Sequence, residues 1–284
     1  MEFKKEELIK SPLNYTGGKF KLLPQILPLF PNSIDTFVDL FGGGFNVGIN
    51  INCENIIYNE LEPHVYDFIE NISNMTGIEA KNKILENVKR FDLSKTNADG
   101  FKKCREEYNL NNSWDMFYSV VSHAFNYQIR YNLKGGYNMP FGKNRSCFNP
   151  SLQSKLVKFV DTIQSKHIKL YNDDFSIVKN IYLDSNDLVY CDPPYLITLA
   201  SYNESNGWNE TKERELLDTL DILNKYNVKF ALSNVLEHKG KTNEILLEWS
   251  AQYNVHFLDK DYNNCSYHGK NMNKKTVEVL ITNY

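Results

Sequence analysis

Short apolar segments typical of buried strands occur in two groups, one toward each end of the chain, and a long stretch without them separates the groups. These segments are rich in β-branched and aromatic residues and are bounded by turn-forming or charged residues. They cover residues 34–41, 55–58, 168–171, 187–191, 228–233, 255–258 and 276–282. Helical periodicity over residues 211–226 and 242–250 separates some of the later segments. Strands that alternate with helices predict an α/β fold, with a mostly parallel sheet covered on both faces.

The stretch between the two groups predicts helices instead of strands. Helical periodicity is clear over residues 78–91 and 114–125, and residues 126–150 are rich in Gly, Asn and Pro, which predicts a loop or hairpin. We therefore predict a discontinuous sheet domain made of residues 1–62 and 161–284. Residues 63–160 are predicted to form a helical domain inserted into it.

The composition is that of an ordinary soluble globular protein. The 284 residues are 42% hydrophobic and 24% charged, no apolar run approaches the length of a membrane span, and the first ten residues are charged where a signal peptide would be apolar. The five cysteines are scattered without a C-x-x-C pair, and the six histidines lack metal-ligand spacing. We expect a cytoplasmic protein with no membrane partner, no metal site and a monomeric state in solution.

The net charge of −3 hides a strong segregation of charge along the chain. Residues 116–160 contain no Asp or Glu, residues 8–34 carry only lysines as charged residues, and so do residues 262–277. The basic residues of these three stretches are Lys10, Lys19, Lys21, Arg130, Lys134, Lys143, Arg145, Lys155, Lys158, Lys270, Lys274 and Lys275. Acid-free basic stretches that also hold Tyr, Phe and Asn favour a polyanion-binding surface. Chance clustering on a solvated surface is the alternative.

A glycine-rich turn follows the first predicted strand. Asp39 and Phe41 lead into Gly42, Gly43 and Gly44, at the end of a strand where α/β sheets bind ligands. Glu60 follows the second predicted strand, where an acidic residue can accept hydrogen bonds from ribose hydroxyls. Phe45 interrupts the spacing of a dinucleotide-binding turn, so a nucleoside without a pyrophosphate fits better. A tight turn beside an exposed Glu is the alternative.

The strand at residues 187–191 ends in Asp192, Pro193, Pro194 and Tyr195. Two consecutive prolines cannot continue a strand ladder and keep the backbone extended, which directs the Asp192 carboxylate and the Pro193 carbonyl toward the strand end. Two acceptors aimed at one point suit an amine donor. Tyr195 adds an aromatic face, and stacking on such a face is worth roughly 1–3 kcal/mol per base. A proline-rich turn with a packed Tyr is the alternative.

Five motifs in order resemble the Dam-like DNA adenine methyltransferases, the α group of amino-methyltransferases. The resemblance covers nearly the whole chain and rests on residues 14–19 (NYTGGK), 41–44 (FGGG), 130–142 (RYN to NMPFG), 172–175 (NDDF) and 192–195 (DPPY). It implies a Rossmann-like S-adenosylmethionine-dependent sheet with an inserted helical target-recognition domain. It further implies methyl transfer to the exocyclic N6 amine of an adenine flipped out of double-stranded DNA.

The resemblance also implies roles for individual residues. Tyr15, Lys19 and Asp39 would surround the methionine end of the cofactor beside Gly42, Gly43 and Gly44, and Glu60 would bind its ribose. The cofactor adenine would be framed by Phe41, Asp174 and Phe175. The catalytic motif is Asp192, Pro193, Pro194 and Tyr195, with Asp192 also next to the cofactor. One departure is Phe45, which stands where the family often has a second glycine.

The hairpin region is expected to read the DNA sequence. Arg130 is the expected bidentate contact to guanine O6 and N7, the commonest specific contact in the major groove. The other expected DNA-binding residues are Asn126, Tyr131, Asn132, Lys134, Pro140, Lys143 and Arg145, of which Lys134, Lys143 and Arg145 would bind phosphates. A GATC site is the leading expectation, with CATG open.

Other functions remain open at the level of sequence. Methylation of the cytosine N4 amine uses the same type of motif, often with Ser in place of Asp192, and protein-glutamine or RNA methyltransferases commonly have Asn there. A DNA-binding relative without activity is a non-enzymatic alternative. Asp192 and the order of the motifs favour adenine, and Tyr195, Lys19 and Glu60 speak against a decayed site.

Overall fold

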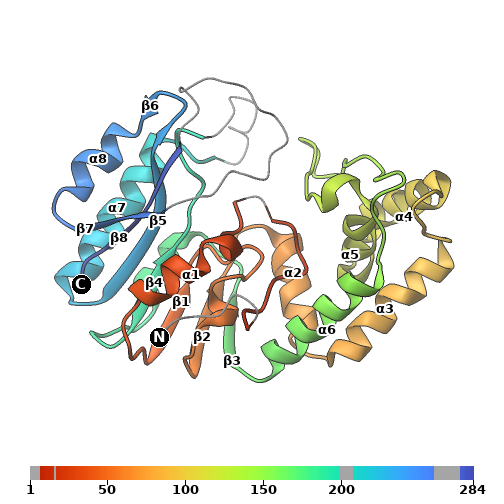
Figure 1. The fold of residues 1–284 in the computed structure, drawn as a ribbon, viewed down its shortest axis with the longest axis horizontal. Helices are drawn as coiled ribbons and strands as arrows, with labels where there is room; N and C mark the ends of the chain where they lie inside the picture. Colours follow the sequence, from red (N-terminus) through yellow and green to blue (C-terminus); the bar gives the residue numbers. More distant parts are fainter. Residues whose placement is uncertain (1–6, 16, 199–206, 259–275) are drawn as a thin grey trace.

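A single central sheet forms the framework of the computed structural model, which describes residues 7–15, 17–198, 207–258 and 276–284 (Figure 1). Its strand order is β3-β2-β1-β4-β5-β8-β7, and the short β6 pairs with β5. The strands are β1 (Thr36–Asp39), β2 (Asn55–Asn59), β3 (His167–Tyr171), β4 (Leu188–Cys191), β5 (Lys229–His238), β6 (Lys241–Thr242), β7 (Asn254–Leu258) and β8 (Thr276–Thr282). The first five strands in this order are parallel, and β8 is antiparallel to both of its neighbours, β5 and β7, which confirms the predicted mostly parallel sheet.

Helices cover both faces of this sheet. The helices are α1 (Leu23–Ile26), α2 (Pro63–Ile72), α3 (Gly77–Arg90), α4 (Ala98–Asn111), α5 (Trp114–His123), α6 (Pro150–Gln164), α7 (Glu210–Lys225) and α8 (Glu244–Ser250). Because side chains alternate along a strand, Phe37 and Tyr190 pack with the α1 region on one face. Val38 and Val189 pack with α7 and α8 on the other. Both layers are therefore dictated by the apolar composition of β1 and β4.

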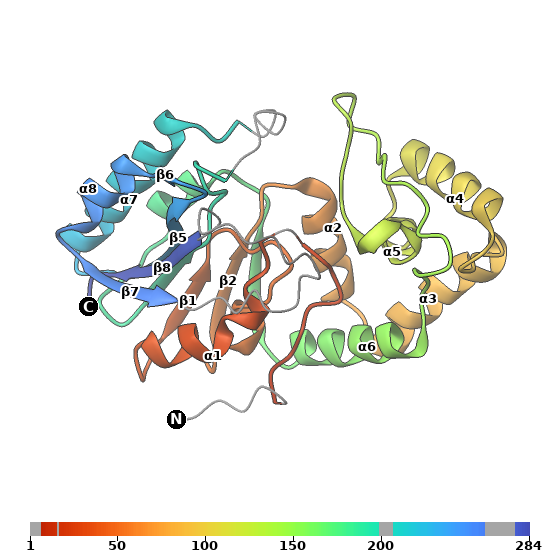
Figure 2. The same ribbon diagram turned by 45° about the horizontal axis from the view of Figure 1, so that its top comes forward.

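The predicted helical stretch forms a group of helices beside the β3 edge of the sheet (Figures 1 and 2). One buried apolar cluster runs from Phe37 and Tyr58 of the sheet through Phe68 of α2 to Ile84 of α3 and Phe159 of α6. Helix α6 continues across residue 160, where the sequence places the end of the inserted domain. The boundary proposed there therefore falls inside a helix, and the helical part shares its core with the sheet.

The stretch after α5 forms the predicted hairpin. Antiparallel bridges join Ala124 to Phe141 and Tyr131 to Tyr137, and a turn at the tip is closed by the Asn132 side chain, which accepts from the backbone amides of Lys134 and Gly136. We call residues 124–142 the recognition hairpin. In Figure 2 it stands out from the helical group and faces the sheet.

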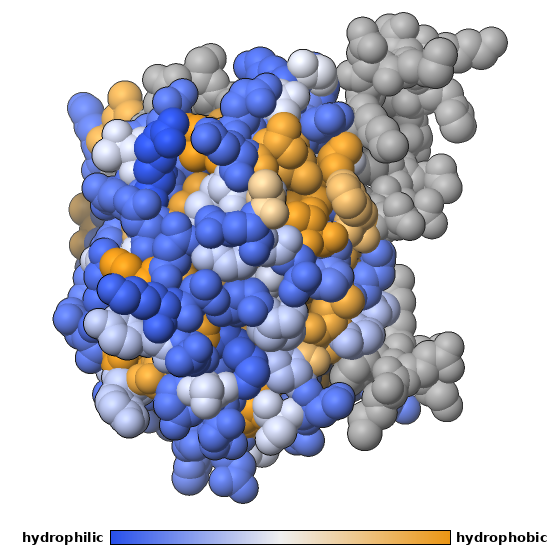
Figure 3. Space-filling model, turned by 90° about the vertical axis from the view of Figure 1, so that its left-hand side faces the viewer, coloured by the Kyte–Doolittle hydropathy of each residue, from blue (hydrophilic) through white to orange (hydrophobic). Residues whose placement is uncertain are grey.

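The face that carries α7, α8 and β7 is mostly hydrophilic, with apolar side chains gathered in one part of it (Figure 3). None of the helices in the described part of the chain combines the length and apolar character needed to cross a membrane. Within the same residues, no group of three or more His, Cys, Asp or Glu side chains is arranged to hold a metal ion.

Candidate active site

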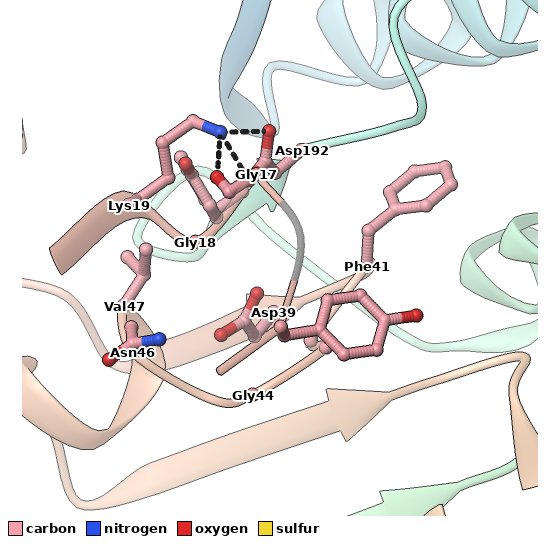
Figure 4. A pocket seen from close by; sticks show the side chains of 13 residues that line it. Gly17, Gly18, Lys19, Asp39, Phe41, Gly44, Asn46, Val47 and Asp192 are labelled. Carbon is pink, nitrogen blue, oxygen red and sulfur yellow. Dashed lines mark hydrogen bonds and ion pairs between the residues drawn. The ribbon is translucent and has the colours of Figure 1, made fainter. Parts of the chain in front are cut away.

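The functional motifs meet where the strand order reverses. β1 and β4 are parallel neighbours, so Asp39 at the end of β1 and Asp192 just after β4 lie at the same edge of the sheet. A pocket at this edge, here called the strand-end pocket, is lined by residues 15, 17–19, 39, 41–44, 46, 47, 190 and 192 (Figure 4). It thus combines three of the five motifs recognised in the sequence.

Lys19 joins two of these motifs through a buried ion pair. Its ammonium group lies 2.7 Å from each carboxylate oxygen of Asp192 and donates to the Gly17 carbonyl at 2.9 Å, as Figure 4 shows. The Lys19 side chain is only 2% exposed, so this pair is largely shielded from solvent. The Tyr195 hydroxyl donates to Asp192 Oδ1 at 2.9 Å, and Lys19 Nζ lies 4.9 Å from the centre of the Tyr195 ring. Burial raises the pKa of Asp192, and the nearby Lys19 ammonium opposes that rise.

Glu278 is a member of this cluster that the sequence did not single out. It lies on β8, is 1% exposed, and places Oε1 3.7 Å from Lys19 Nζ and 3.3 Å from the Tyr195 hydroxyl. The sequence held a signal for it, because Glu278 is the one charged residue in the apolar run of residues 276–282. A charge in a core strand is costly unless it is paired, so its presence there indicated a buried partner.

Asp39 is the second acidic side chain of the strand-end pocket. It is 2% exposed, and its Oδ2 accepts the backbone N–H of Gly48 at 3.0 Å. Burial raises the pKa of Asp39 to about 8, with further contributions from the carboxylates of Asp192 and Glu60. A carboxyl group in this setting favours a positively charged partner in the pocket.

Glu60 shapes the glycine turn and does not line the pocket. Its carboxylate accepts the backbone N–H groups of Gly43 at 2.6 Å and Glu62 at 2.8 Å, with the Tyr15 hydroxyl at 3.5 Å. Gly43 has a φ of 48°, and a Cβ there would lie 3.1 Å from the Tyr15 ring. Glu60 therefore fixes the turn that forms the pocket wall, and binding of a ribose by this carboxylate remains a prediction.

The aromatic residues expected to frame an adenine contact each other directly. Phe41 and Phe175 stack with ring centres 5.8 Å apart, and Trp208 packs edge-on against both. Phe41 lines the pocket while Phe175 is buried beneath it, so the structure holds no gap between the two rings. Asp174 caps the short helix after β3 and lies 3.6 Å from Lys212 Nζ.

Trp208 is a second residue that the sequence did not single out. Its indole N–H donates to Glu213 at 2.8 Å, and Glu213 also accepts from Asn234 and Asn243. Glu213 is fully buried, so these neutral donors hold its carboxylate in place, and the Trp208 indole is held with it. No feature of the sequence distinguished Trp208 from a core aromatic residue.

The donor set of the strand-end pocket fits S-adenosylmethionine, whose methionine end carries both charges. Carboxylates from Asp39 and Asp192 can meet its cationic groups, Lys19 can meet its carboxylate, and the glycines allow close approach of the backbone. The cavity has a volume of about 60 Å³, because Lys19 reaches across it to Asp192 (Figure 4).

The predicted DNA-binding residues divide into exposed and packed groups. Arg130, Asn132, Lys134, Pro140, Lys143 and Arg145 are exposed, as is Asn126. Arg130 donates through Nε to Asn138 Oδ1 at 2.8 Å and through Nη2 to the Asn138 carbonyl, so its guanidinium bridges the two arms of the hairpin. Tyr131 differs from the others, because its ring stacks on His64 and its hydroxyl lies 2.9 Å from that of Tyr108.

Two parts of the DNA-binding prediction remain, Asn126 of the hairpin and the lysines of the third basic stretch. Asn126 adopts a left-handed conformation with φ 54°, its carbonyl accepts from the Asn14 side chain, and its Oδ1 lies 3.4 Å from Arg145 Nη1. The hairpin base is thereby tied to the first motif. The lysines of the third basic stretch, Lys270, Lys274 and Lys275, lie outside the described residues.

Comparisons with known proteins agree with the motifs. Residues 15–264 match the family model described as D12 class N6 adenine-specific DNA methyltransferase. The chain is 48% identical to Type II methyltransferase M.FokI of Planomicrobium okeanokoites and 44% identical to Modification methylase StsI of Streptococcus sanguinis, over 99% and 98% of its length. It spans only 44% and 43% of those two proteins. A DNA adenine methylase of Vibrio cholerae is 26% identical, with 86% of each chain covered.

Proposed function

Because the chain belongs to the D12 class N6 adenine-specific DNA methyltransferases, we propose that it transfers a methyl group from S-adenosylmethionine to the N6 amine of an adenine in duplex DNA. The observation that carries this proposal is the position of Asp192. Its carboxylate stands at the end of β4, in the same pocket as the glycine turn and the buried Asp39. A target inside the duplex must be flipped out to reach this point.

Asp192 supplies the acceptor that the reaction needs. An adenine amine is a poor nucleophile, since its lone pair is delocalised into the ring. A carboxylate and the neighbouring Pro193 carbonyl that accept its hydrogens favour a pyramidal nitrogen with a directed lone pair. Both Asp192 oxygens contact Lys19 in the structure, so Lys19 withdraws when the amine binds. Pro194 holds the motif extended, and the Tyr195 ring offers a stacking surface for the base.

The cofactor brings an activated methyl group on a sulfonium sulfur, and the chain positions it. We assign Tyr15, Lys19 and Asp39 to its methionine end, the Gly42–Gly44 turn to close backbone contact and Phe41 to one side of its adenine. Glu60 keeps its predicted role in binding the ribose, and its carboxylate also fixes the turn. Asp174 and Phe175 support the adenine site, Asp174 by capping the short helix Phe175–Asn180 and Phe175 by stacking on the Phe41 ring.

Sequence recognition is assigned to the recognition hairpin and the exposed basic residues next to it. Arg130 is proposed to read a guanine, and GATC is the leading site with CATG as the alternative. Asn126, Asn132 and Pro140 would lie near the bases, with Lys134, Lys143 and Arg145 on phosphates. The names of the two longer relatives, a Type II methyltransferase and a modification methylase, support a role beside a restriction enzyme.

The test is transfer of tritium from labelled S-adenosylmethionine to duplex DNA, followed by identification of the modified base. We expect N6-methyladenine, and label found only in cytosine would support the N4 alternative instead. Asp192→Ala should lower turnover by at least about 10³-fold, which is roughly 4 kcal/mol of barrier. The same variant should still bind S-adenosylhomocysteine measurably. Full turnover of Asp192→Ala would remove the carboxylate from the mechanism.

A further inference from the structure

A second cavity lies between the N-terminal segment and the start of α6. Its volume is about 330 Å³, several times that of the strand-end pocket. Lys10 to Asn14 form one wall, and Tyr127, Asn149 and Lys155 contribute from the other side. Two of the acid-free basic stretches, separated by about eighty residues in the sequence, thus meet at one cavity. We refer to it as the Lys10–Lys155 cavity.

No acidic side chain in the lining of this cavity offsets its positive charge, and Lys10 Nζ lies 5.4 Å from the centre of the Phe20 ring. The lining contains Lys10 and Lys155 but no Asp or Glu, and neither lysine forms an ion pair with any residue that the structure describes. Burial lowers the pKa of Lys155, and the nearby Lys10 ammonium lowers it further. Two cations held near each other, one of them half-buried, raise the free energy of the empty cavity. An anion between them would relieve that repulsion.

Neutral groups around the cavity also suit an anion. Asn149 caps α6 by accepting the Leu152 N–H, and Ser151 in the first turn is exposed at the cavity. The fifteen-residue helix has no acidic residue in its first turn, so its positive dipole end faces the cavity unopposed. Of these groups, the Ser151 hydroxyl can add a hydrogen-bond donor to the two ammonium groups, while the Leu152 N–H is already taken by Asn149.

The position of the cavity indicates which anion binds there. The Asn14 side chain donates to the Asn126 carbonyl at 2.8 Å, which joins the cavity wall to the base of the recognition hairpin. The same segment continues to Lys19 in the strand-end pocket, and five residues span at most about 18 Å. Lys10, at the other end of this wall, is nine residues from Lys19, and nine residues span at most about 32 Å. With a rise of about 3.4 Å per base pair, the cavity lies within about ten base pairs of the base held at Asp192.

We propose that the Lys10–Lys155 cavity binds one phosphodiester group of the DNA backbone close to the target adenine. The proposal rests on the proposed function for its ligand, since the phosphate belongs to the duplex that is methylated. Fixing one phosphate between two lysines sets the register of the duplex relative to Asp192. This contact carries no sequence information, so it acts on affinity and positioning and leaves the choice of site to the hairpin.

The first test measures duplex affinity as a function of KCl concentration, by fluorescence anisotropy with S-adenosylhomocysteine present. Lys155→Gln should weaken binding about fivefold and make the slope of log affinity against log salt less negative by about 0.9, the value for one phosphate. Lys10→Gln should act in the same direction. Lys225→Gln, at the exposed end of α7, is the matched control and should change neither quantity.

The second test locates the phosphate with duplexes that carry a single neutral methylphosphonate at successive positions. For the wild type, one position within about ten base pairs of the target should cost about fivefold in affinity. At that position Lys155→Gln should lose clearly less than the wild type, because only the Lys10 contact remains, while Lys225→Gln should lose as much as the wild type. Equal losses for Lys155→Gln and the wild type at every position would overturn the assignment.

Two further outcomes separate this proposal from others. Binding of inorganic phosphate to the cavity, with an unchanged salt slope of DNA binding in Lys155→Gln, would assign the cavity to free phosphate and overturn the DNA contact. A wild-type protein that binds duplex DNA with the expected Lys155 dependence but transfers no methyl group to adenine would refute the proposed reaction. The phosphate site would stand in that case.

Discussion

Asp39 stands at the end of β1 with a buried carboxyl group close to the carboxylates of Asp192 and Glu60. Burial raises the pKa of Asp39 to about 8, whereas an unfolded chain has an Asp pKa of about 4. Between these two pH values the folded protein therefore holds a proton that the unfolded chain releases. It follows that the contribution of Asp39 to the free energy of unfolding falls as the pH rises from about 4 to about 8.

The substitution Asp39→Asn should remove this pH dependence. The amide keeps an acceptor for the Gly48 N–H but cannot ionise. At pH 8 and without cofactor, we expect the substitution to raise the free energy of unfolding by more than about 1.4 kcal/mol, the value of one pKa unit. At pH 4 the variant and the wild type should be nearly equal. Urea unfolding across this range measures both, and parallel stability curves would show that Asp39 is not the titrating group.

Glu278 should influence turnover through Lys19 and Tyr195. When the amine of the base takes the Asp192 oxygens, Glu278 offers the Lys19 ammonium a second carboxylate 3.7 Å away. Glu278→Gln removes that charge, so Lys19 stays on Asp192, and we expect kcat to fall about tenfold, near 1.4 kcal/mol, with KM for DNA unchanged. Glu237→Gln, exposed on β5, is the control. A rise in KM with kcat unchanged would contradict this positioning role.

At the residue scale, the sequence predicted four of the residues that line the strand-end pocket, but not which side chains they contact. Tyr15, Lys19, Asp39 and Asp192 all line the strand-end pocket, because motifs at strand ends must meet at one edge of a parallel sheet. The ion pair of Lys19 with Asp192 depends on side-chain directions that no pattern of residue types specifies. The same limit explains why the inward packing of Tyr131 was not foreseen.

Among the elements, boundaries were predicted best where apolar runs end at turn residues. Helix α3 was predicted over residues 78–91 and is Gly77–Arg90, and α5 was expected from Trp114. β5 is longer than the predicted residues 228–233, because its second half pairs with β8. That antiparallel pairing joins segments about forty residues apart, so local periodicity does not reveal it.

Two substitutions in the recognition hairpin distinguish a structural role of Arg130 from a role in DNA recognition. Arg130 bridges to Asn138, so Arg130→Ala removes both a guanine contact and a link between the arms, whereas Asn138→Ala removes the side-chain acceptor and keeps the guanidinium. We expect Arg130→Ala to cost about 1–3 kcal/mol of discrimination at one base pair. Asn138→Ala should keep the site profile. Competition binding against single-base variants of the site measures the site profile of each variant. If Arg130→Ala has the same profile as the wild type, Arg130 has a structural role and does not read a base.

For the whole molecule, the shared core argues that the sheet and the helical part unfold together. The apolar cluster extends without interruption from β1 and β2 through α2 to α6, although the sequence predicts an inserted domain. Side chains that pack against both parts lose contacts whichever part opens first. We therefore expect one cooperative transition, as in a single two-state unit.

The three tryptophans make this prediction measurable. Trp114 of α5 packs against Phe68 of α2, while Trp249 of α8 packs against Phe230 of β5 on the other face of the sheet. One variant keeps Trp114 alone, with Trp208→Phe and Trp249→Phe, and the other keeps Trp249 alone, with Trp208→Phe and Trp114→Phe. Within each variant, the urea midpoint from tryptophan fluorescence should equal that from far-UV circular dichroism. A fluorescence transition of Trp114 at clearly lower urea than the circular dichroism transition would instead identify the helical part as an independently unfolding domain.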